Sequence, residues 1–221
     1  MSEIENEVLL PKMQRTKKRA PISYLNLLAT GLCIMLLIFA TFINLNIKHF
    51  IIPTDLFTNK NLSYENFVYT FCLVPQIPFV MFICSILGKK MATVSVILYI
   101  LLGLTFVPIF ALGGGITYIG QYGFGYILSF IAAVIVAGNF LNEKYSFLDM
   151  IKATLSGVLI IHLAGILYMI IIALIKHAGW DFISSWIIAQ SGLKIIYDLI
   201  VSFILVMIGK YLHFGLKYIT Q

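Results

Sequence analysis

The amino-acid sequence predicts an all-α integral membrane protein with six transmembrane helices. Of its 221 residues, 61% are hydrophobic and only 11% are charged, whereas a soluble domain carries about 25% charged residues. The charged residues occur in short groups separated by long apolar stretches. The run from Met91 to Asn142 contains no charged residue and no histidine. A helix that crosses a bilayer needs roughly 20 apolar residues, so stretches of this kind are long enough to span the membrane.

Six apolar stretches reach this length, and each is expected to form one spanning helix. Pro75 and Pro78 interrupt the second stretch, and proline removes a helical hydrogen bond. Together the stretches form one membrane domain over residues 22–215, preceded by a polar cytoplasmic tail at residues 1–21. The expected spans are residues 22–47, 66–88, 91–112, 120–141, 150–176 and 184–209.

The basic residues predict that both termini lie in the cytoplasm. With the N-terminus inside, only Lys48, Lys60 and Lys176 fall outside, and Lys194 falls at the edge of the last span. The other eleven of the fifteen lysines and arginines are then cytoplasmic, in keeping with the preference of basic residues for cytoplasmic loops. The net charge of +6 is explained by this topology. The basic residues at 12–19 have no folded nucleic-acid-binding module behind them, so no nucleic-acid partner is expected.

The connections between the spans differ in length. Residues 48–65 form the longest external loop, whereas residues 88–91 leave the second and third spans little room to separate. These two spans are therefore expected to be tight antiparallel neighbours. Trp180 and Trp186 lie where interfacial tryptophan is expected.

A glycine-rich segment, Ala111–Phe130, predicts a pocket between the third and fourth spans. Backbone outside a helix is tolerated in a membrane only where protein or a watery cavity covers it. Glycines let a ligand approach the backbone, and tyrosines combine an apolar ring with a polar tip. In the alternative interpretation the glycines only form a tight turn and the tyrosines belong to the interfacial aromatic belt. The candidate ligand-binding residues here are Gly113, Gly114, Gly115, Tyr118, Gln121, Tyr122 and Tyr126.

Lys194 and Asp198 are a second candidate for ligand binding. They are four residues apart near the outer end of the last span, so they share one face of a helix. Ionisable residues inside a membrane are costly and are functional candidates by default. Two alternatives are a mutual ion pair, and a lysine whose ammonium group extends outward to the interface.

No catalytic residue, metal site or resident cofactor is expected. The four histidines have no metal-ligand spacing such as HExxH, and the chain has neither a GxSxG elbow nor a Walker A sequence. Any ATP consumed in transport must therefore be bound by another chain. His162, the histidine deepest in a span, is expected to be neutral and hydrogen-bonded between helices. An enzyme built on His162 and Asp198 is a remote rival, because these residues have no known catalytic spacing.

The order of several short motifs resembles that of the BioY family, the biotin-binding S components of energy-coupling factor (ECF) transporters. The resemblance extends over about residues 70–215. The motifs that carry it begin with Pro75-Gln-Ile-Pro78-Phe and Leu87-Gly88, continue with Tyr99-Ile-Leu-Leu-Gly103-Leu and Pro108-Ile-Phe-Ala-Leu-Gly113-Gly-Gly, and end with Phe124-Gly-Tyr126-Ile-Leu-Ser-Phe130.

The resemblance implies an S-component-like bundle of six helices in a bacterial plasma membrane. Such a subunit captures a vitamin at the external face and docks on a coupling membrane subunit that two ATPases drive. Biotin would be its transported ligand, with Lys194 neutralising the carboxylate, and Gln121, Tyr122 and the glycine amides meeting the polar edges. Phe124, Tyr126 and Tyr168 would pack against the rings of biotin.

The chain departs from the family pattern at two places. Many members carry Gly-Asp-x-x-Lys at the start of the last span, where the aspartate and lysine contact biotin. Here the lysine is Lys194, but Ser191 stands at the acidic position, and Asp198 is a candidate substitute. The family's docking motif Ala-x-x-x-Ala is also reduced to Ala29-x-x-x-Cys33 in the first span. Two rivals therefore stay open beside biotin uptake, namely an S component for another vitamin and a membrane scaffold that transports nothing.

Protease accessibility in intact cells tests this topology. A tag at Gln221 should resist external protease, while a tag near Lys60 should be cleaved, because the basic residues place these positions on opposite sides of the membrane. A C-terminal tag that is cleaved in intact cells would show that the spans are miscounted.

Overall fold

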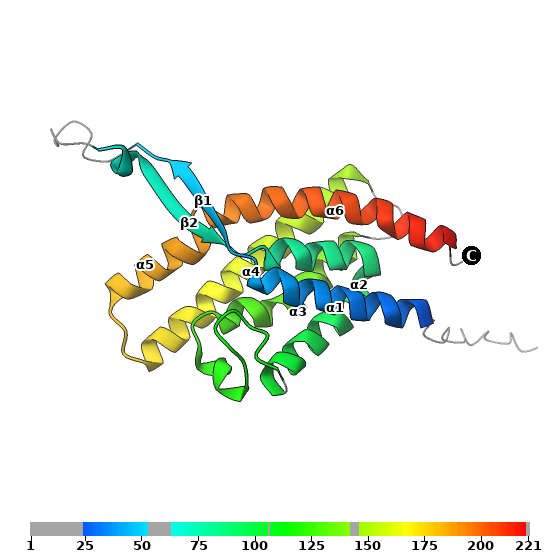
Figure 1. Ribbon diagram of the computed structural model, residues 1–221, viewed down its shortest axis with the longest axis horizontal. Helices are drawn as coiled ribbons and strands as arrows, with labels where there is room; N and C mark the ends of the chain where they lie inside the picture. Colours follow the sequence, from blue (N-terminus) through cyan, green and yellow to red (C-terminus); the bar gives the residue numbers. More distant parts are fainter. Residues whose placement is uncertain (1–23, 53–62, 106, 142–145, 220–221) are drawn as a thin grey trace, which may run out of the picture.

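The computed structural model describes residues 24–52, 63–105, 107–141 and 146–219. The predicted tail at 1–21 and the middle of the predicted loop at 48–65 lie outside these ranges. Within them the chain forms a bundle of six α-helices with one β-hairpin (Figure 1). The helices are α1 (Tyr24–Phe42), α2 (Gln76–Thr105), α3 (Phe124–Phe140), α4 (Phe147–Ile175), α5 (Trp180–Ser191) and α6 (Lys194–Ile219). The hairpin strands are β1 (Leu45–Phe50) and β2 (Val68–Leu73), and short 3-10 turns occur at Tyr64–Phe67 and Ile116–Gly120.

Gly88 divides α2 into two helical segments. Its backbone has φ 70° and ψ 171°, which is not helical. Figure 1 shows the chain reversing its direction there, so that the two segments correspond to the predicted second and third spans. Side chains rarely adopt a positive φ, and glycine does so freely. The short connection at 88–91 therefore joins two antiparallel neighbouring helices, as predicted.

The second span starts later than the sequence prediction of residue 66. Residues 68–73 form β2, which pairs antiparallel with β1, and α2 begins only after Pro75. Aromatic and β-branched residues fill β2 and favour a strand, while Pro78 falls in the first turn of α2, where proline is tolerated. The same pairing ends the first span at Phe42, short of the predicted residue 47.

The hairpin is attached to the bundle through Tyr197 of α6. The phenol oxygen of Tyr197 lies 3.1 Å from Nδ1 of His49 on β1, and its ring packs against Phe71 of β2. Figure 1 shows the hairpin projecting beyond the α5–α6 junction.

The remaining spans lie close to their predicted positions. The fourth and fifth correspond to α3 and α4, and the Oγ of Ser146 caps α4 by accepting from the Asp149 amide at 3.1 Å. The predicted sixth span, 184–209, corresponds to two helices, which together are longer than predicted. The helix is interrupted around Gly192, where α5 ends at Ser191 and α6 starts at Lys194.

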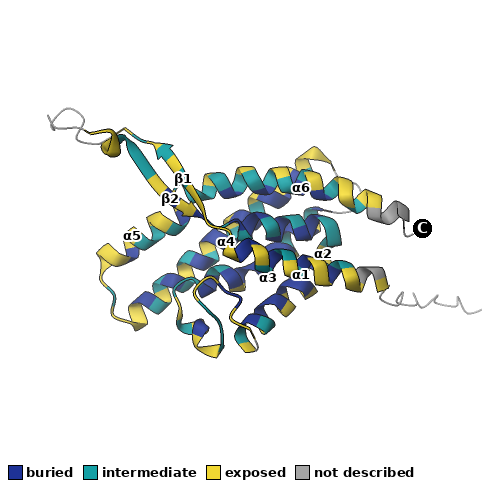
Figure 2. Cartoon of the chain, viewed as in Figure 1, coloured by how far each residue is buried: buried dark blue, intermediate teal, exposed yellow. Residues whose placement is uncertain are grey.

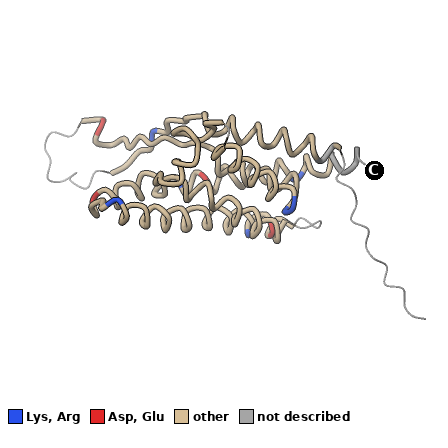
Figure 3. Tube along the Cα trace, turned by 90° about the horizontal axis from the view of Figure 1, so that it is seen from below, with Lys and Arg blue, Asp and Glu red and all other residues tan. Residues whose placement is uncertain are grey.

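The distribution of side chains agrees with a membrane bundle. Three helical stretches, 76–105, 147–175 and 180–215, are long and apolar enough to cross a membrane, and 27–42 and 124–140 are shorter apolar helices. Large apolar side chains stay exposed on outer faces (Figure 2), where lipid chains replace water as the surroundings. Apart from one acidic residue near the middle, the charged residues gather towards the two ends of the long axis (Figure 3). The all-α membrane fold is thus confirmed, with the hairpin as an addition.

Replacement of Gly88 by alanine tests the turn inside α2. A backbone with φ +70° costs a non-glycine residue of order 1–3 kcal/mol, although an added Cβ meets nothing within 4 Å. Gly88→Ala should therefore lower the melting temperature in detergent. Gly31→Ala is the matched control, since Gly31 is helical and also has free space, so the change should be neutral or stabilising. Equal melting temperatures for the two variants would contradict this account of the turn.

Candidate functional site

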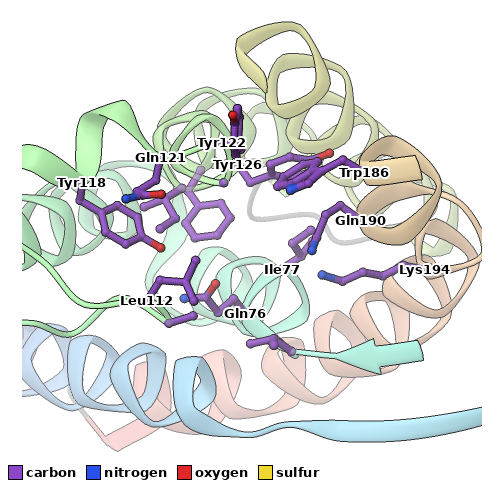
Figure 4. Close-up of a pocket in the computed structure, with 15 residues that line it drawn as sticks. Gln76, Ile77, Leu112, Tyr118, Gln121, Tyr122, Tyr126, Trp186, Gln190 and Lys194 are labelled. Carbon is purple, nitrogen blue, oxygen red and sulfur yellow. The ribbon is translucent and has the colours of Figure 1, made fainter. Parts of the chain in front are cut away.

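A cavity of about 270 Å³ lies among the start of α2, residues 111–123, α3 and the α5–α6 junction (Figure 4). Its volume is close to the lower end of the range for small-molecule sites. The wall combines aromatic rings, aliphatic side chains, three glutamines and one lysine. The lining residues are Val74, Gln76, Ile77, Ala111, Leu112, Tyr118, Gln121, Tyr122, Gly123, Tyr126, Ile127, Phe130, Trp186, Gln190 and Lys194.

The structure brings five of the predicted site residues to this cavity from three separate segments. Tyr118, Gln121 and Tyr122 come from the segment between α2 and α3, Tyr126 comes from α3, and Lys194 begins α6. The other six predicted residues do not line it: Gly113, Gly114, Gly115, Phe124, Tyr168 and Asp198.

Three rings form one aromatic wall of the cavity. The ring centroid of Trp186 lies 5.8 Å from that of Tyr126 and 6.3 Å from that of Tyr122. The Nζ of Lys176 lies 4.6 Å from the centroid of Tyr122, and also donates to the carbonyl of Gly120 at 2.7 Å. Since Trp186 lines the cavity, interfacial anchoring is not its whole role.

Phe124 and Tyr168 support the cavity from behind. Phe124 packs its ring against Tyr118 at 6.1 Å and Tyr168 at 6.0 Å, and the Tyr168 hydroxyl donates to the carbonyl of Ile119. Burial raises the pKa of Tyr118, although a hydrogen bond to the backbone of Leu112 partly opposes the shift. Tyr118 therefore stays a neutral phenol at pH 7.

The three glycines at 113–115 build the turn next to the cavity. Gly113 and Gly115 have positive φ values of 120° and 83°. The backbone amide of Gly113 donates to the carbonyl of Phe110, and the amide of Gly115 donates to the carbonyl of Gly103. A Cβ on Gly114 would lie 2.6 Å from the Cα of Pro108. These features are those of the alternative interpretation, a tight turn, and a ligand contact by these glycines stays a prediction.

Lys194 has no ion pair or hydrogen bond with any residue that the structure describes. Its side chain extends into the cavity (Figure 4). The sequence offered an ion pair with Asp198 as one alternative, and this pair is not formed. The lysine therefore lies at the edge of an aromatic cavity with no counter-ion among the described residues.

Asp198 pairs instead with His162, which lies on α4. The Oδ2 of Asp198 is 3.2 Å from Nε2 of His162, and the two side chains are 0% and 1% exposed. Nδ1 of the same imidazole lies 2.9 Å from the Oγ of Ser191. That hydroxyl is 2.7 Å from the phenol oxygen of Tyr126. A continuous chain of hydrogen bonds thus runs from the buried carboxylate to a side chain of the cavity wall.

This series of hydrogen bonds contains a serine, a histidine and an aspartate, but the three side chains are not arranged for nucleophilic attack. Ser191 is only 4% exposed and does not line the cavity, and its hydroxyl already contacts both His162 and Tyr126. The geometry gives Ser191 the role of a link that fixes the Tyr126 hydroxyl. Asp198 does not line the cavity and is linked to Ser191 through His162, so its substitution for an acidic residue at position 191 stays a prediction.

Sequence reasoning missed Gln76, Gln190 and Trp186 as cavity residues. Gln76 was noticed only as part of a proline motif, although a glutamine next to an apolar span is a polar group that needs a partner. Gln190 stands just before the Ser191–Lys194 stretch, and the same argument applies to it. Gln76 and Gln190 lie near helix ends and Trp186 lies in the middle of α5, and no periodicity in the sequence separates them from their neighbours.

An apolar helix bundle with a partly polar cavity near one end is the architecture of a membrane protein that binds a small molecule. Comparison with known proteins makes this specific. The BioY family model matches residues 15–217, which is nearly the whole chain, so this chain belongs to the BioY family. The resemblance seen in the sequence motifs is confirmed.

Two relatives and one solved structure are similar to this chain. A probable biotin transporter BioY from Lysinibacillus sphaericus is 36% identical over 102 residues, and the biotin transporter BioY from Thermotoga maritima is 36% identical over 93 residues. These alignments cover 44% and 41% of this chain, and 52% and 54% of the relatives. This chain therefore spans about half the length of the curated relatives it matches.

The crystal structure of the S-component for biotin from an ECF-type ABC transporter shares the fold. Its TM-score is 0.60 at 19% sequence identity, and the alignment covers 85% of this chain and 89% of that chain. The predicted S-component-like bundle is confirmed by this similarity.

The His162–Asp198 pair gives a prediction about stability. His162→Leu leaves a buried carboxylate without its partner and should reduce folded yield, with a loss of about 3–5 kcal/mol. The double change His162→Leu, Asp198→Leu should recover most of that yield, because both polar groups are then absent. The measurement is the monodisperse fraction and the melting temperature in detergent. A single variant that is as stable as the wild type would show that the pair does not matter to the fold.

Proposed function

We propose that this protein is the biotin-binding membrane subunit, or S component, of an ATP-driven uptake transporter. It captures biotin at the external face of a bacterial plasma membrane. The observation that carries the proposal is the ammonium group of Lys194, which no described residue pairs, in a cavity otherwise lined by aromatic, aliphatic and amide side chains. Membership of the BioY family and two relatives named as biotin transporters support the same ligand.

Biotin has three chemically different parts, and the cavity offers a match for each. The carboxylate of its tail suits Lys194, because a charge-assisted hydrogen bond is stronger than a neutral one. The apolar faces of its fused rings suit Tyr122, Tyr126 and Trp186. The ureido group needs both donors and acceptors, which the glutamine side chains supply.

The chain acts as a transport subunit and not as an enzyme. As the family resemblance implies, it works with a coupling membrane subunit and two ATPase subunits, and its own sequence has no Walker A motif. Both termini lie in the cytoplasm. In support, α1 begins and α6 ends at one end of the bundle, while α5, which contributes Trp186 and Gln190 to the cavity, lies towards the other end with the hairpin (Figure 1).

A thermal-shift assay on the purified protein tests the ligand. Biotin at 100 times its Kd should stabilise the native state by about 2.7 kcal/mol, because it binds only the folded protein. Other vitamins at the same concentration serve as controls. A shift with another vitamin but none with biotin would overturn the biotin assignment and favour an S component for that vitamin.

Lys194→Met extends this test to the site. The loss of a charge-assisted hydrogen bond of about 1.5–3 kcal/mol should weaken biotin roughly 10- to 100-fold, and should leave the affinity for an uncharged biotin amide nearly unchanged. Folded yield should be maintained, since Lys194 is not paired with Asp198. Lys176→Met is the matched control, because Lys176 contacts Tyr122 from outside the cavity lining. Equal weakening of biotin and its amide would contradict the role of Lys194.

A further inference from the structure

Gln76 is the one cavity glutamine whose amide is held by hydrogen bonds within the described part of the chain. Its Nε2 donates to the Oγ1 of Thr41 at 2.6 Å and to the hydroxyl of Tyr99 at 2.9 Å. Gln121 and Gln190 also line the cavity, but neither side chain bonds to a described residue. Gln76 therefore presents a fixed group, whereas the other two amides are free to turn.

The partners of Gln76 determine which end of the amide faces the cavity. The Thr41 hydroxyl donates to the carbonyl of Leu37 at 2.9 Å, so its oxygen is left to accept. The Tyr99 hydroxyl lies 3.1 Å from the Oγ1 of Thr41 and donates to it, so the Tyr99 oxygen is also left to accept. Neither hydroxyl has a proton left for Gln76, so both oxygens can only accept from the amide, and only its NH₂ group donates twice.

This arrangement is rigid because its anchors are buried. Thr41 is 2% exposed and Tyr99 is fully buried, and they come from α1 and from the second segment of α2. With both N–H groups occupied, the Oε1 of Gln76 has no partner among the described residues. Figure 4 shows Gln76 on the cavity wall with this oxygen towards the aromatic rings.

We propose that Gln76 is a specificity-determining residue whose Oε1 accepts a hydrogen bond from an N–H donor of the ligand. For biotin, the donor is one of the two ureido N–H groups. Lys194 reaches the cavity from another side (Figure 4), so the cation and the fixed acceptor orient the molecule between its charged tail and its ureido ring. This inference rests on the proposed function, and it adds the orientation of the ligand and a reason for rejecting look-alikes.

The physical basis of the selection is the unpaired acceptor. A ligand with oxygen in place of the N–H has the same shape but brings two acceptors together and leaves Oε1 desolvated. A buried polar group left without a partner costs more than a hydrogen bond contributes. Sites that hydrogen-bond a ligand group reject analogues that lack it for this reason.

The test uses biotin and its two cyclic-carbamate isosteres, in each of which a ring oxygen replaces one ureido N–H. Wild-type protein should bind one isostere at least about tenfold more weakly than biotin. Gln76→Met should bind biotin roughly three- to tenfold more weakly than the wild type does, and should bind that isostere and biotin about equally. Gln76→Glu keeps an acceptor oxygen but loses both anchoring N–H groups, so its discrimination should be weaker than that of the wild type and stronger than that of Gln76→Met. Because all three ligands carry the carboxylate, their affinity ratio does not depend on the charge change.

Tyr99→Phe provides a second route to the same readout, since Tyr99 does not line the cavity. This variant removes one of the two anchors of Gln76, so the ratio of isostere to biotin dissociation constants should fall about two- to threefold. If Gln76→Met does not fold, this measurement decides the matter. Equal ratios in the wild type and these variants would overturn the role of Gln76 while leaving biotin binding intact. Failure of the wild-type protein to bind biotin at all would overturn the proposed function itself.

Discussion

Polar groups inside an apolar bundle must find their partners within the protein, and this constraint organises the structure around Asp198. A carboxylate at membrane depth is costly unless it is paired. Asp198 is fully buried on α6, and its partner His162 belongs to α4. The imidazole in turn contacts Ser191 at the end of α5, and Ser191 contacts Tyr126 of α3. The hydrogen bonds that start from this one buried side chain thereby connect four helices.

The cavity depends on that arrangement and on a second one like it. Tyr126 is held by the hydrogen bonds that lead through Ser191 and His162 to Asp198, while Gln76 is held by two buried hydroxyls of α1 and α2. The two sets of hydrogen bonds lie on different walls of the same cavity, so Gln76 and Tyr126 are positioned before any ligand enters. Lys194 differs, because no described residue pairs with it, and its charge stays available to an anion.

Sequence reasoning predicted most of the fold because apolar length is a strong signal. The fourth and fifth spans were placed to within four residues of α3 and α4. The hairpin was missed because β2 runs directly into an apolar helix, and a short apolar run does not distinguish strand from helix. The candidate site was predicted in part. Tyr118, Gln121, Tyr122, Tyr126 and Lys194 are marked by residue type, but the pairing of His162 with Asp198 joins residues 36 positions apart and has no local pattern.

A structure of the protein with biotin bound is the most direct test of the central claim, that a vitamin sits between Gln76 and Lys194. We expect the biotin carboxylate within about 3 Å of the Lys194 Nζ, a charge-assisted hydrogen-bond distance, and a ureido nitrogen at hydrogen-bond distance from the Gln76 Oε1. The rings should lie against Tyr126 and Trp186. Biotin bound outside this cavity, or inside it with the carboxylate away from Lys194, would contradict the account.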